Sequence, residues 1–491
     1  MERGNLAAAF EGVGTSAVTH LSYDSRCVKP GTLFFCKGAH FEPEYVVQAV
    51  RAGALAYVSE CDYTAVLESA GFSAVPVLLV QELRTALGDI AALFYRGLLN
   101  HLTLIGFTGT KGKSTTTYLL KAILDSWLAE QGKEKCAWLS SIENYDGVEL
   151  TRSLLTTQDV LELYAHFNNA VESNIAYLVM EVSSQALKYG RTHNLWFEVA
   201  GFLNIGEDHI SDIEHPNHED YFASKLSIFS QSGTAVINED SCEAQRILVA
   251  AEQCETVLTY GHGEQADMRA GDVEATASGL SFGVACKDWG EQFTLPMAGL
   301  FNVENALAAL TAAYALGIPV KHMQAGLAHC QVSGRMELIA GPDDKLIIVD
   351  YAHNKMSFQT LFETVSKDYP GRTLVSVFGA TGGKGIERRL DLPAVAVKYA
   401  SMIYVTEDDP GEEPLAQINQ QIAEVVEKAG CPYSIVEDRS QAIERAIIEA
   451  PQGSVVLILG KGHETVMKRG RESVPVLSDA ECAKQVCQRG V

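Results

Sequence analysis

The sequence lacks any pair of cysteines spaced for a zinc site or a redox motif. Its 11 cysteines stand singly, their number is odd, and there is no C-x-x-C pair. This pattern argues against a structural zinc site and against a disulfide framework. It is typical of buried thiols in a reducing cytosol.

Positive charge and long apolar runs are also scarce. Lys and Arg number 38 against 62 Asp and Glu, which gives a formal net charge of −24 and excludes a general affinity for nucleic acid or anionic membranes. No apolar run reaches about 18 residues, and the apolar run within residues 1–14 is too short for a signal peptide. We therefore expect a cytoplasmic protein without membrane insertion, in which any phosphate is bound locally.

What is present is ordinary globular composition. Of the 491 residues, 47% are hydrophobic and 20% are charged, which suits a folded protein. No segment of roughly 20–50 residues repeats, so solenoids and arrays are excluded. At roughly 100–200 residues per domain, the length predicts about three domains.

Apolar runs and helical patterns place domain boundaries near Asn100 and Arg335, giving domains over residues 1–99, 100–335 and 336–491. In the middle segment, strand-like runs alternate with helical ones such as Val160–Glu172, a pattern typical of βαβ units around a mostly parallel sheet. Residues 259–297 carry shorter alternating runs, which predict a β-rich insertion or edge. A second α/β series follows Arg335, with predicted strands at Lys345–Asp350, Leu374–Phe378, Met402–Thr406 and Val455–Leu459.

The clearest local motif lies between a predicted strand, Leu102–Phe107, and a helical pattern. Its glycines allow backbone N–H groups to turn inward around phosphate oxygens, Lys113 adds a charge, and the Ser114 hydroxyl suits a magnesium ion. Phe107 stands where the strict P-loop pattern has its first glycine, and a simple helix cap is the alternative. The predicted nucleotide cradle comprises Gly109, Thr110, Lys111, Gly112, Lys113, Ser114 and Thr115.

Two further strands end in polar side chains. Glu181 closes one apolar run, and Asp208 and His209 follow the next. Ligands of open α/β sheets lie at the carboxyl ends of strands, so these residues predict a second magnesium site; a helix cap with a surface histidine is the alternative. Lys225 lies on a predicted helix over Tyr221–Phe229, where a lone lysine is normally solvated, so the residue pattern alone gives it no role.

These and other motifs resemble the Mur ligases in type and order. They are GTKGKST, EVSSQAL, N-x-x-x-D-H followed by Y-F-x-x-K, and the segments Gly299–Ala306, Ser333–Glu337 and Asp350–Asn354. At the amino terminus, Tyr23–Arg26 and Pro30–Phe35 are similar to the uridine-nucleotide domain of the MurE type. Gly460–Glu464 is similar to the amino-acid pocket of the same type.

The resemblance implies an α/β protein of three domains: an N-terminal uridine-nucleotide domain, a central ATPase domain with a P-loop-type, mostly parallel sheet, and a C-terminal Rossmann-like domain that binds the amino acid. It also implies a cytoplasmic, ATP-dependent ligation in peptidoglycan synthesis. The glutamate γ-carboxylate of UDP-N-acetylmuramoyl-L-alanyl-D-glutamate becomes an acyl phosphate, and an amino acid then displaces phosphate. Two Mg²⁺ ions assist, and a monomer is expected.

Site residues follow from the resemblance position by position. Lys113, Lys225, His209 and Arg335 correspond to catalytic positions, and Lys225 to a lysine that the family carbamylates. Metal positions are Ser114, Glu181, His209 and the carbamylated Lys225. Besides the cradle, ATP positions are Asn302, Asn305, Arg335 and Asp350. UDP-substrate positions are Tyr23, Ser25, Ala39, His40, Phe41, Thr156, Thr157, Ser183 and Arg191.

The identity of the added amino acid rests on the segment Thr406–Glu413. Members that add meso-diaminopimelate have a D-N-P-R motif here, and Gly411 replaces its arginine, which grips the extra carboxylate of that substrate. The predicted amino-acid pocket comprises Lys384, Asp408, Asp409, Gly460 and Glu464. Because acidic residues surround Gly411, we expect a cationic terminus and therefore L-lysine; a plain acidic surface loop is the alternative.

Other functions remain open at this stage. Ornithine or meso-diaminopimelate could replace lysine as the added amino acid. Folylpolyglutamate synthetase-like and MurF-type enzymes share the phosphate loop, but the former lack the N-terminal domain and the latter differ at EVSSQAL. A catalytically silent nucleotide-binding homologue is the alternative outside the ligases.

Overall fold

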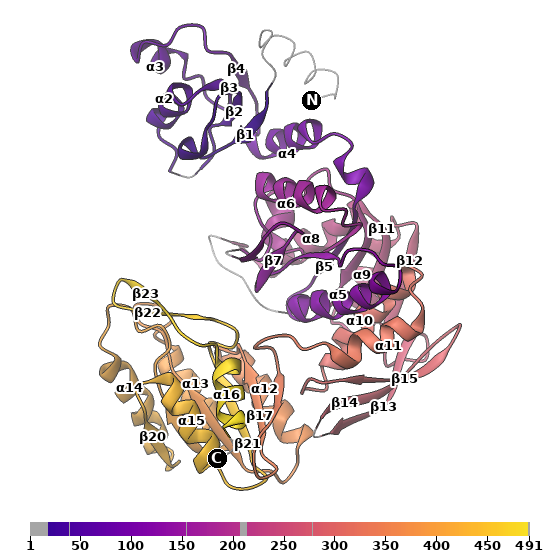
Figure 1. Ribbon diagram of the computed structural model, residues 1–491, viewed down its shortest axis with the longest axis vertical. Coiled ribbons are helices and arrows are strands. Elements are labelled where there is room, and N and C mark those ends of the chain that lie inside the picture. The colour runs from indigo at the N-terminus through magenta and orange to yellow at the C-terminus, as the bar shows by residue number, and fades with distance from the viewer. Residues whose placement is uncertain (1–17, 39, 154, 207–213, 277, 490–491) are drawn as a thin grey trace. The chain divides into compact units, whose positions relative to one another are not determined.

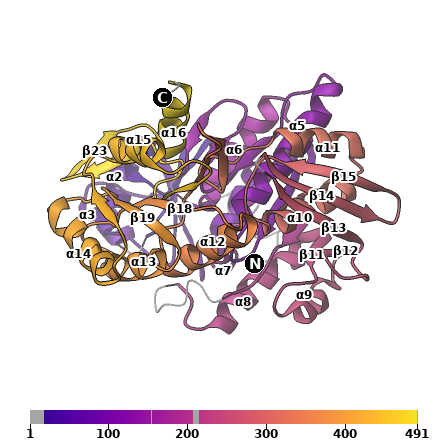
Figure 2. The same ribbon diagram turned by 90° about the horizontal axis from the view of Figure 1, so that it is seen from below.

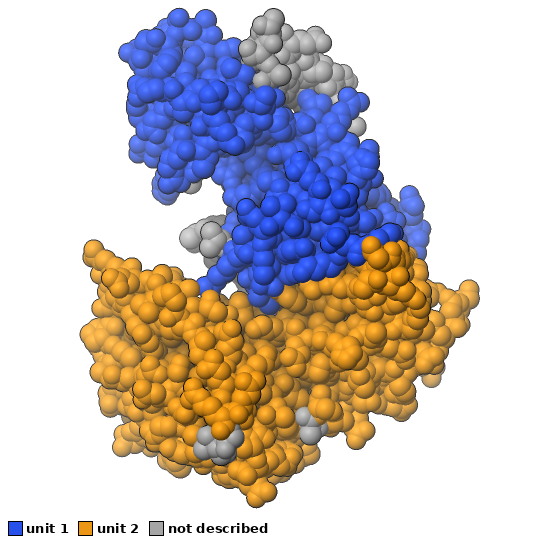
Figure 3. Space-filling view, in the orientation of Figure 1, with its two compact units in different colours: residues 1–111, 133–235, 245–257 blue, residues 112–132, 236–244, 258–491 orange. Residues whose placement is uncertain are grey.

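The computed structural model describes residues 18–38, 40–153, 155–206, 214–276 and 278–489. By its internal contacts the chain forms two compact units (Figure 3). Unit 1 comprises residues 1–111, 133–235 and 245–257, and unit 2 comprises residues 112–132, 236–244 and 258–491. These two units do not test the predicted division into three domains, which stays a prediction.

Unit 1 begins with a small parallel sheet, in the order β1 (His20–Ser22), β2 (Thr32–Phe35), β3 (Ala54–Ser59) and β4 (Val77–Leu79). Helices α2 (Pro43–Arg51) and α3 (Thr64–Ser69) pack against it. Their apolar residues Val46, Val47 and Leu67 share a core with Phe34 and Tyr57. Helix α4 (Leu83–Phe94) follows.

The larger sheet of unit 1 carries the predicted βαβ pattern. Its strand order is β10 (Phe197–Phe202), β5 (Thr103–Thr108), β9 (Tyr177–Glu181), β6 (Ala137–Leu139), β7 (Glu143–Tyr145) and β8 (Leu150–Arg152). The first four strands are parallel to one another, whereas β7 runs antiparallel to β6 and β8 runs antiparallel to β7. Helices α6 (Val160–Glu172), α7 (Ser184–Lys188) and α8 (His218–Leu226) belong to this unit.

These strands are part of an eleven-stranded sheet, whose other members are β11 (Ser232–Asn238), β12 (Thr256–Gly261), β13 (Met268–Thr276), β14 (Gly279–Cys286) and β15 (Gly290–Leu295). Between β11 and β12 lies α9 (Ala244–Ala251). In unit 2, α5 (Lys113–Glu130) packs against α10 (Asn302–Ala315) and α11 (Val320–His329). A Cβ at Gly326 would lie 2.6 Å from the Cα of Ile123, so glycine lets these two helices approach.

The C-terminal part of unit 2 is a three-layer α/β/α sandwich. Its sheet order is β16 (Glu337–Ala340), β17 (Leu346–Asp350), β21 (Val455–Leu459), β18 (Leu374–Phe378), β19 (Ala400–Val405) and β20 (Tyr433–Ile435), with only β16 antiparallel. One core holds α12 (Lys355–Asp368), α13 (Arg388–Ala396) and α14 (Leu415–Lys428) against one face. A second core holds α15 (Arg439–Glu449) and α16 (Asp479–Gln488) against the other (Figures 1 and 2). A hairpin of β22 (Val466–Arg469) and β23 (Glu472–Pro475) precedes α16.

The predicted fold class is confirmed, and several elements have the predicted bounds. Helix α6 and strands β18 and β21 coincide with the predicted Val160–Glu172, Leu374–Phe378 and Val455–Leu459. The β-rich segment at 259–297 is also confirmed, as β12 to β15. Helix α8 begins three residues before its predicted start because the Asn217 side chain caps it by accepting from the Asp220 N–H. Among the described residues, no helix is both long and apolar enough to cross a membrane.

Candidate active site

The first half of the predicted cradle follows β5 in unit 1. Gly109 has a φ of +148°, and a Cβ there would lie 3.0 Å from the Cβ of Leu203. The side chain of Asn204, after β10, holds the next turn: its Oδ1 accepts from Lys111 N at 2.9 Å, and its Nδ2 donates to Lys111 O at 3.1 Å. Two neighbouring parallel strands therefore fix the loop from both sides.

Helix α8 contributes two further contacts to this half of the cradle. Thr110 Oγ1 accepts from the Tyr221 hydroxyl at 3.1 Å. Lys225, only 1% exposed, donates from Nζ to Gly109 O at 2.9 Å, and its Nζ lies 4.6 Å from the Tyr221 ring centroid. Lys225 thus differs from a typical lone helical lysine, because the helix directs it inward to the loop backbone.

The second half of the cradle opens α5 in unit 2. Gly112, with a φ of +87°, is the N-cap, and Lys113, Ser114 and Thr115 form the first turn. N–H groups of a first helical turn have no partner within the helix, and they favour anions. The side chains of Ser114 and Thr115 are buried. This turn has the geometry of a phosphate-binding helix start.

The residues predicted to hold magnesium are chemically suited to it in part. Glu181, 2% exposed, ends β9, and its Oε1 accepts from Ser141 N at 2.7 Å. Carboxylate and hydroxyl oxygens such as those of Glu181 and Ser114 are the donors that Mg²⁺ prefers. Lys225 fits only if its ammonium becomes a carbamate. Asp208 and His209 lie outside the described residues, and the described residues contain no cluster of three metal-ligating acid, His or Cys side chains.

Three of the predicted UDP-substrate residues meet beside Glu181. Thr157 Oγ1 donates to Glu181 O at 2.9 Å, Ser183 N donates to Thr157 Oγ1 at 2.9 Å, and Arg191 donates to Thr157 O at 2.9 Å. The half-buried Thr156 precedes them. The carboxyl end of β9 thus gathers a cation and two hydroxyl groups.

The remaining substrate positions lie in the N-terminal part of unit 1. The Tyr23 hydroxyl donates to Glu162 at 2.9 Å, and Ser25 donates to Gln48 at 3.1 Å. Burial, followed by the charge of Glu162, raises the pKa of Tyr23 well above its usual range. Phe41 packs among aromatic rings, including Tyr45 at 5.8 Å, and His40 is exposed. Ala39 lies outside the described residues.

Within unit 2, hydrogen bonds connect the predicted nucleotide residues. Asn305 donates to Asn302 Oδ1 at 2.8 Å, and Asn302 donates to Ala298 O at 2.7 Å. Ala298 N donates to Met336 O at 3.1 Å, and Met336 N donates to Asp350 Oδ2 at 2.8 Å. Arg335 lies with its guanidinium carbon 5.1 Å from the Tyr351 ring centroid. All four predicted residues therefore belong to one cluster.

The predicted amino-acid residues lie on three loops at the carboxyl ends of β18, β19 and β21. Gly382 N donates to Asp409 O at 3.1 Å, which joins the loop of the exposed Lys384 to that of Asp409. Gly460 has a φ of +113°, and a Cβ there would lie 2.5 Å from Asp408 Oδ2, so a larger residue would be strained and would displace that carboxylate. Glu464 pairs with Lys461 at 2.5 Å.

The acidic segment is less negative than its sequence indicates, which corrects part of the argument for a cationic terminus. Each of four carboxylates has a cationic partner supplied by the chain itself. The pairs are Glu407 with Arg469 at 2.5 Å, Asp409 with Lys461 at 2.8 Å, Glu412 with Arg471 at 2.6 Å and Glu413 with Arg389 at 2.6 Å. Composition alone could not reveal these partners, because they come from distant parts of the chain.

Asp408 differs from its neighbours. It is 7% exposed, and no hydrogen bond or ion pair between described residues involves its carboxylate. Burial raises its pKa to about 6, against the opposing influence of the Arg439 and Lys461 charges. Within this segment, Asp408 is therefore the carboxylate that has no direct cationic partner among the described residues.

Sequence reasoning missed several residues that shape these sites. Tyr221, His215 and Arg439 are buried polar side chains whose partners lie far away in the sequence. Asn204 and Tyr221 did stand in quoted motifs, although no structural role was assigned to them. For Arg439 and its partner Asp479, 40 residues later, the sequence carries no signal.

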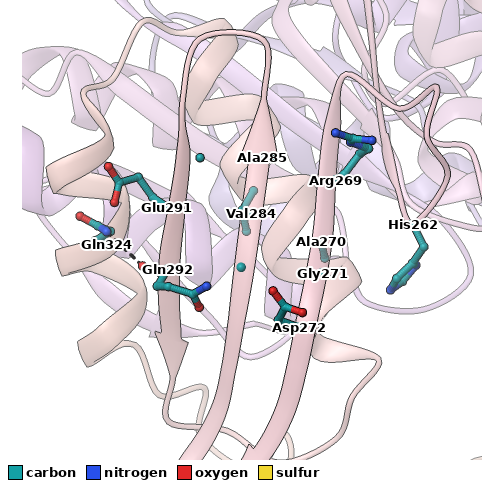
Figure 4. A pocket seen from close by; sticks show the side chains of 12 residues that line it. His262, Arg269, Ala270, Gly271, Asp272, Val284, Ala285, Glu291, Gln292 and Gln324 are labelled. Carbon is teal, nitrogen blue, oxygen red and sulfur yellow. Dashed lines mark hydrogen bonds between the residues drawn. The ribbon is translucent and has the colours of Figure 1, made fainter.

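A groove lies elsewhere, lined mainly by residues of β13, β14 and β15 (Figure 4). It has a volume of about 540 Å³, and its lining includes Arg269, Gly271, Gly283 and Gln292. None of the predicted site residues belongs to its lining. The chemistry predicted for this chain therefore does not use this groove.

Comparison with known proteins agrees with the motifs. The model of the Mur ligase middle domain matches residues 107–313, and that of the Mur ligase glutamate ligase domain matches residues 334–462. A UDP-N-acetylmuramoyl-L-alanyl-D-glutamate–2,6-diaminopimelate ligase of Caldanaerobacter subterraneus is 35% identical over 474 residues, which cover 96% of this chain and 94% of that protein. A UDP-N-acetylmuramoyl-L-alanyl-D-glutamate–L-lysine ligase of Enterococcus faecalis is 35% identical over 479 residues, covering 96% and 92%.

The fold is likewise shared with solved structures. The structure of a UDP-N-acetylmuramoyl-L-alanyl-D-glutamate–2,6-diaminopimelate ligase matches with a TM-score of 0.71 and 24% identity, over 98% of each chain. A MurF from Acinetobacter baumannii matches with a TM-score of 0.61 and 22% identity, over 92% of this chain and 95% of that one. The chain therefore belongs to the Mur ligase family, in its MurE type, and is an ATP-dependent acid–amino acid ligase.

Proposed function

We propose that this ligase adds L-lysine, as the third amino acid, to UDP-N-acetylmuramoyl-L-alanyl-D-glutamate. The observation that carries the proposal is Asp408, a nearly buried carboxylate whose charge no described side chain neutralises by direct contact. An ε-ammonium group is a suitable partner for it, since a charge-assisted hydrogen bond offsets the cost of burying both groups.

Gly411 supports lysine over meso-diaminopimelate. Its φ is +58°, a region that L side chains rarely adopt, and its backbone pairs with the β22–β23 hairpin through Lys468 O at 3.0 Å. The hairpin thus holds residue 411 in a conformation suited to glycine. A guanidinium that could grip a second carboxylate is absent from this position.

In the proposed reaction, the cradle binds the ATP phosphates through its backbone N–H groups and Lys113. Arg191, with Thr157 and Ser183, orients the substrate carboxylate near the carboxyl end of β9. Attack of this carboxylate on the γ-phosphate gives an acyl phosphate and ADP, and the amine of lysine then displaces phosphate. Arg335, Asn302, Asn305 and Asp350 hold the nucleotide, and Tyr23, Ser25, His40 and Phe41 the uridine part.

Magnesium, when bound, would offset the repulsion among the phosphate and carboxylate oxygens. Glu181, Ser114 and His209 would hold it together with Lys225 in its carbamylated form. Carbamylation replaces the ammonium of Lys225 by an anion. The contact of Lys225 Nζ with Gly109 O supports this assignment, because the carbamate would then lie at the cradle. We place the reaction in the cytoplasm and expect a monomer.

The test is phosphate release from ATP and Mg²⁺ with the UDP-linked dipeptide. Lysine, ornithine, meso-diaminopimelate and no amino acid are supplied in separate reactions. Release that depends on lysine, with the tripeptide product identified by mass, is the expected result. Release that depends on another of the amino acids would overturn the lysine assignment and keep the ligation. No release under any condition would overturn the proposed reaction.

A further inference from the structure

Three polar side chains of unit 1 form a chain of hydrogen bonds that the reaction described above does not use. Ser184 Oγ lies 2.9 Å from His215 Nε2, and His215 Nδ1 lies 2.6 Å from Asp220 Oδ2. Ser184 is 4% exposed and His215 is fully buried. The three residues come from the start of α7, the segment before α8, and α8 itself.

The charged groups around these three hydrogen-bonded side chains determine which of their atoms carry the protons. Lys188 Nζ lies 2.6 Å from Asp220 Oδ2, and Lys188 with His215 lowers the pKa of Asp220, so the carboxylate is ionised. An ionised carboxylate only accepts, so Nδ1 of His215 carries the proton that is donated to it. In the neutral ring Nε2 is then an acceptor, and Ser184 Oγ–H donates to it. The Tyr221 ring also lies beside the imidazole, at 5.2 Å between centroids.

The outer end of this chain lies at the predicted substrate residues. Ser184 directly follows Ser183, whose N–H is bonded to Thr157, and stands three residues after Glu181 at the end of β9. On the other side, Tyr221 joins His215 to the cradle, because its hydroxyl donates to Thr110. Ser184 Oγ is thus a proton-accepting group at the edge of the sheet where the acyl phosphate would form.

We propose that Ser184 accepts the proton of the attacking amine and passes its own to His215, which Asp220 holds in the required tautomer. The inference rests on the proposed function. As the amine nitrogen bonds to the acyl carbon, an N–H proton moves to Ser184 Oγ and the Ser184 proton moves to His215 Nε2. The C–O bond to phosphate then breaks, its electron pair stays on phosphate, and Ser184 Oγ gives its proton to that leaving group while it takes its own back from His215 Nε2. In this assignment Ser184 is the group in contact with the substrate, and His215 and Asp220, which act only through Ser184, are positioning residues.

The experiment separates acyl phosphate formation from attack by the amine. His215→Gln, Asp220→Asn and Ser184→Ala are compared with the unsubstituted protein, using lysine in one series and hydroxylamine in another. Hydroxylamine is largely unprotonated at neutral pH, and its weakly basic nitrogen loses a proton to water after attack. Its hydroxamate product therefore reports the acyl phosphate without a protein group as proton acceptor. His166→Gln is the matched control, since His166 also pairs with an aspartate of unit 1, Asp146, at 2.7 Å.

We expect His215→Gln to lower kcat with saturating lysine roughly 100-fold or more, while hydroxamate formation changes less than about threefold. The unsubstituted protein should reach a plateau in kcat with lysine as pH rises, and His215→Gln should lack this plateau, a change that a purely structural role would not produce. Equal losses in both reactions, or no loss with lysine, would overturn the inference. Absence of hydroxamate even in the unsubstituted protein would instead overturn the proposed function.

Discussion

At the scale of single residues, the environment of Lys225 bears on whether its side chain can bind a metal ion. An ammonium that is 1% exposed and bonded to the Gly109 carbonyl cannot ligate a cation, whereas a carbamate can. We predict that Lys225→Ala lowers the ligation rate roughly 100-fold or more, and that short-chain carboxylates added to the assay partly restore it by supplying the missing anion. Phosphate release in the presence of lysine is the measurement.

Two comparisons sharpen this test. Lys225→Arg keeps a positive charge, cannot be carbamylated and should not be rescued by carboxylates. Lys355, an exposed lysine paired with Asp391, provides the matched control, because Lys355→Ala should leave the rate unchanged. Equal activity of Lys225→Arg and the unsubstituted protein would contradict the carbamylated form.

Asp408 leads to a prediction about pH. Its raised pKa, about 6, means that the free protein carries the neutral acid below that pH and the carboxylate above it. A lysine ε-ammonium binds the carboxylate, so KM for lysine should rise about tenfold for each pH unit below 6 and level off above it. Steady-state kinetics from pH 5 to about 8 measure this.

Substitutions in the same loop separate Asp408 from its neighbours. Asp408→Asn should raise KM for lysine and abolish its pH dependence, because the amide does not titrate. Glu412→Gln should change neither quantity, since Glu412 is exposed and paired with Arg471. An unchanged KM in Asp408→Asn would remove Asp408 from the pocket.

At the scale of elements, one buried ion pair ties together the loops that follow β19 and β21. Arg439, at the start of α15, donates to Glu407 O at 3.2 Å and to Leu459 O at 2.8 Å, and it pairs with Asp479 at 2.6 Å. Asp479 in turn accepts from Gly462 N at 2.9 Å. Burial of both side chains makes the pair costly to break from one side only.

We predict that Arg439→Met lowers the free energy of unfolding by about 3–5 kcal/mol, because it leaves the Asp479 charge buried and uncompensated. The double substitution Arg439→Met with Asp479→Leu should recover much of this loss. Urea unfolding of the variants measures the loss and its recovery. KM for lysine should rise in the single and in the double variant, since the carbonyls of both loops lose the Arg439 guanidinium as their donor. Equal destabilisation of the single and double variants would contradict the ion-pair argument.

Elements were predictable from the sequence where a local signal fixes both ends. Val455–Leu459 is an apolar run that is buried throughout, and Val160–Glu172 follows a capping box formed by Asp159 and Glu162. The turn between β5 and α5 was predictable for the same reason, since its glycines and Lys113 are adjacent in sequence. Helix α8 had less certain limits, because its cap, Asn217, lies outside the apolar pattern.

At the scale of the whole molecule, tertiary pairing limits what a sequence shows. The acidic segment after β19 predicted a cationic substrate terminus, yet four of its carboxylates are already neutralised by Arg469, Arg471, Lys461 and Arg389. Likewise, Ser184 and His215 are 31 residues apart and belong to different elements. Such pairs depend on the path of the chain, which residue types and spacing do not determine.

The state of the cysteines provides a prediction for the entire chain. All eleven are free thiols, and burial raises the pKa of Cys36 and of Cys330 to about 12. The native protein should therefore react rapidly with a thiol reagent only at exposed positions, namely Cys27, Cys61 and Cys242. Unfolded without reductant, it should titrate as eleven thiols, and added reductant should leave Tm unchanged. Fewer than eleven thiols in the unfolded, unreduced protein would mean that a disulfide forms, which would contradict a protein adapted to a reducing compartment.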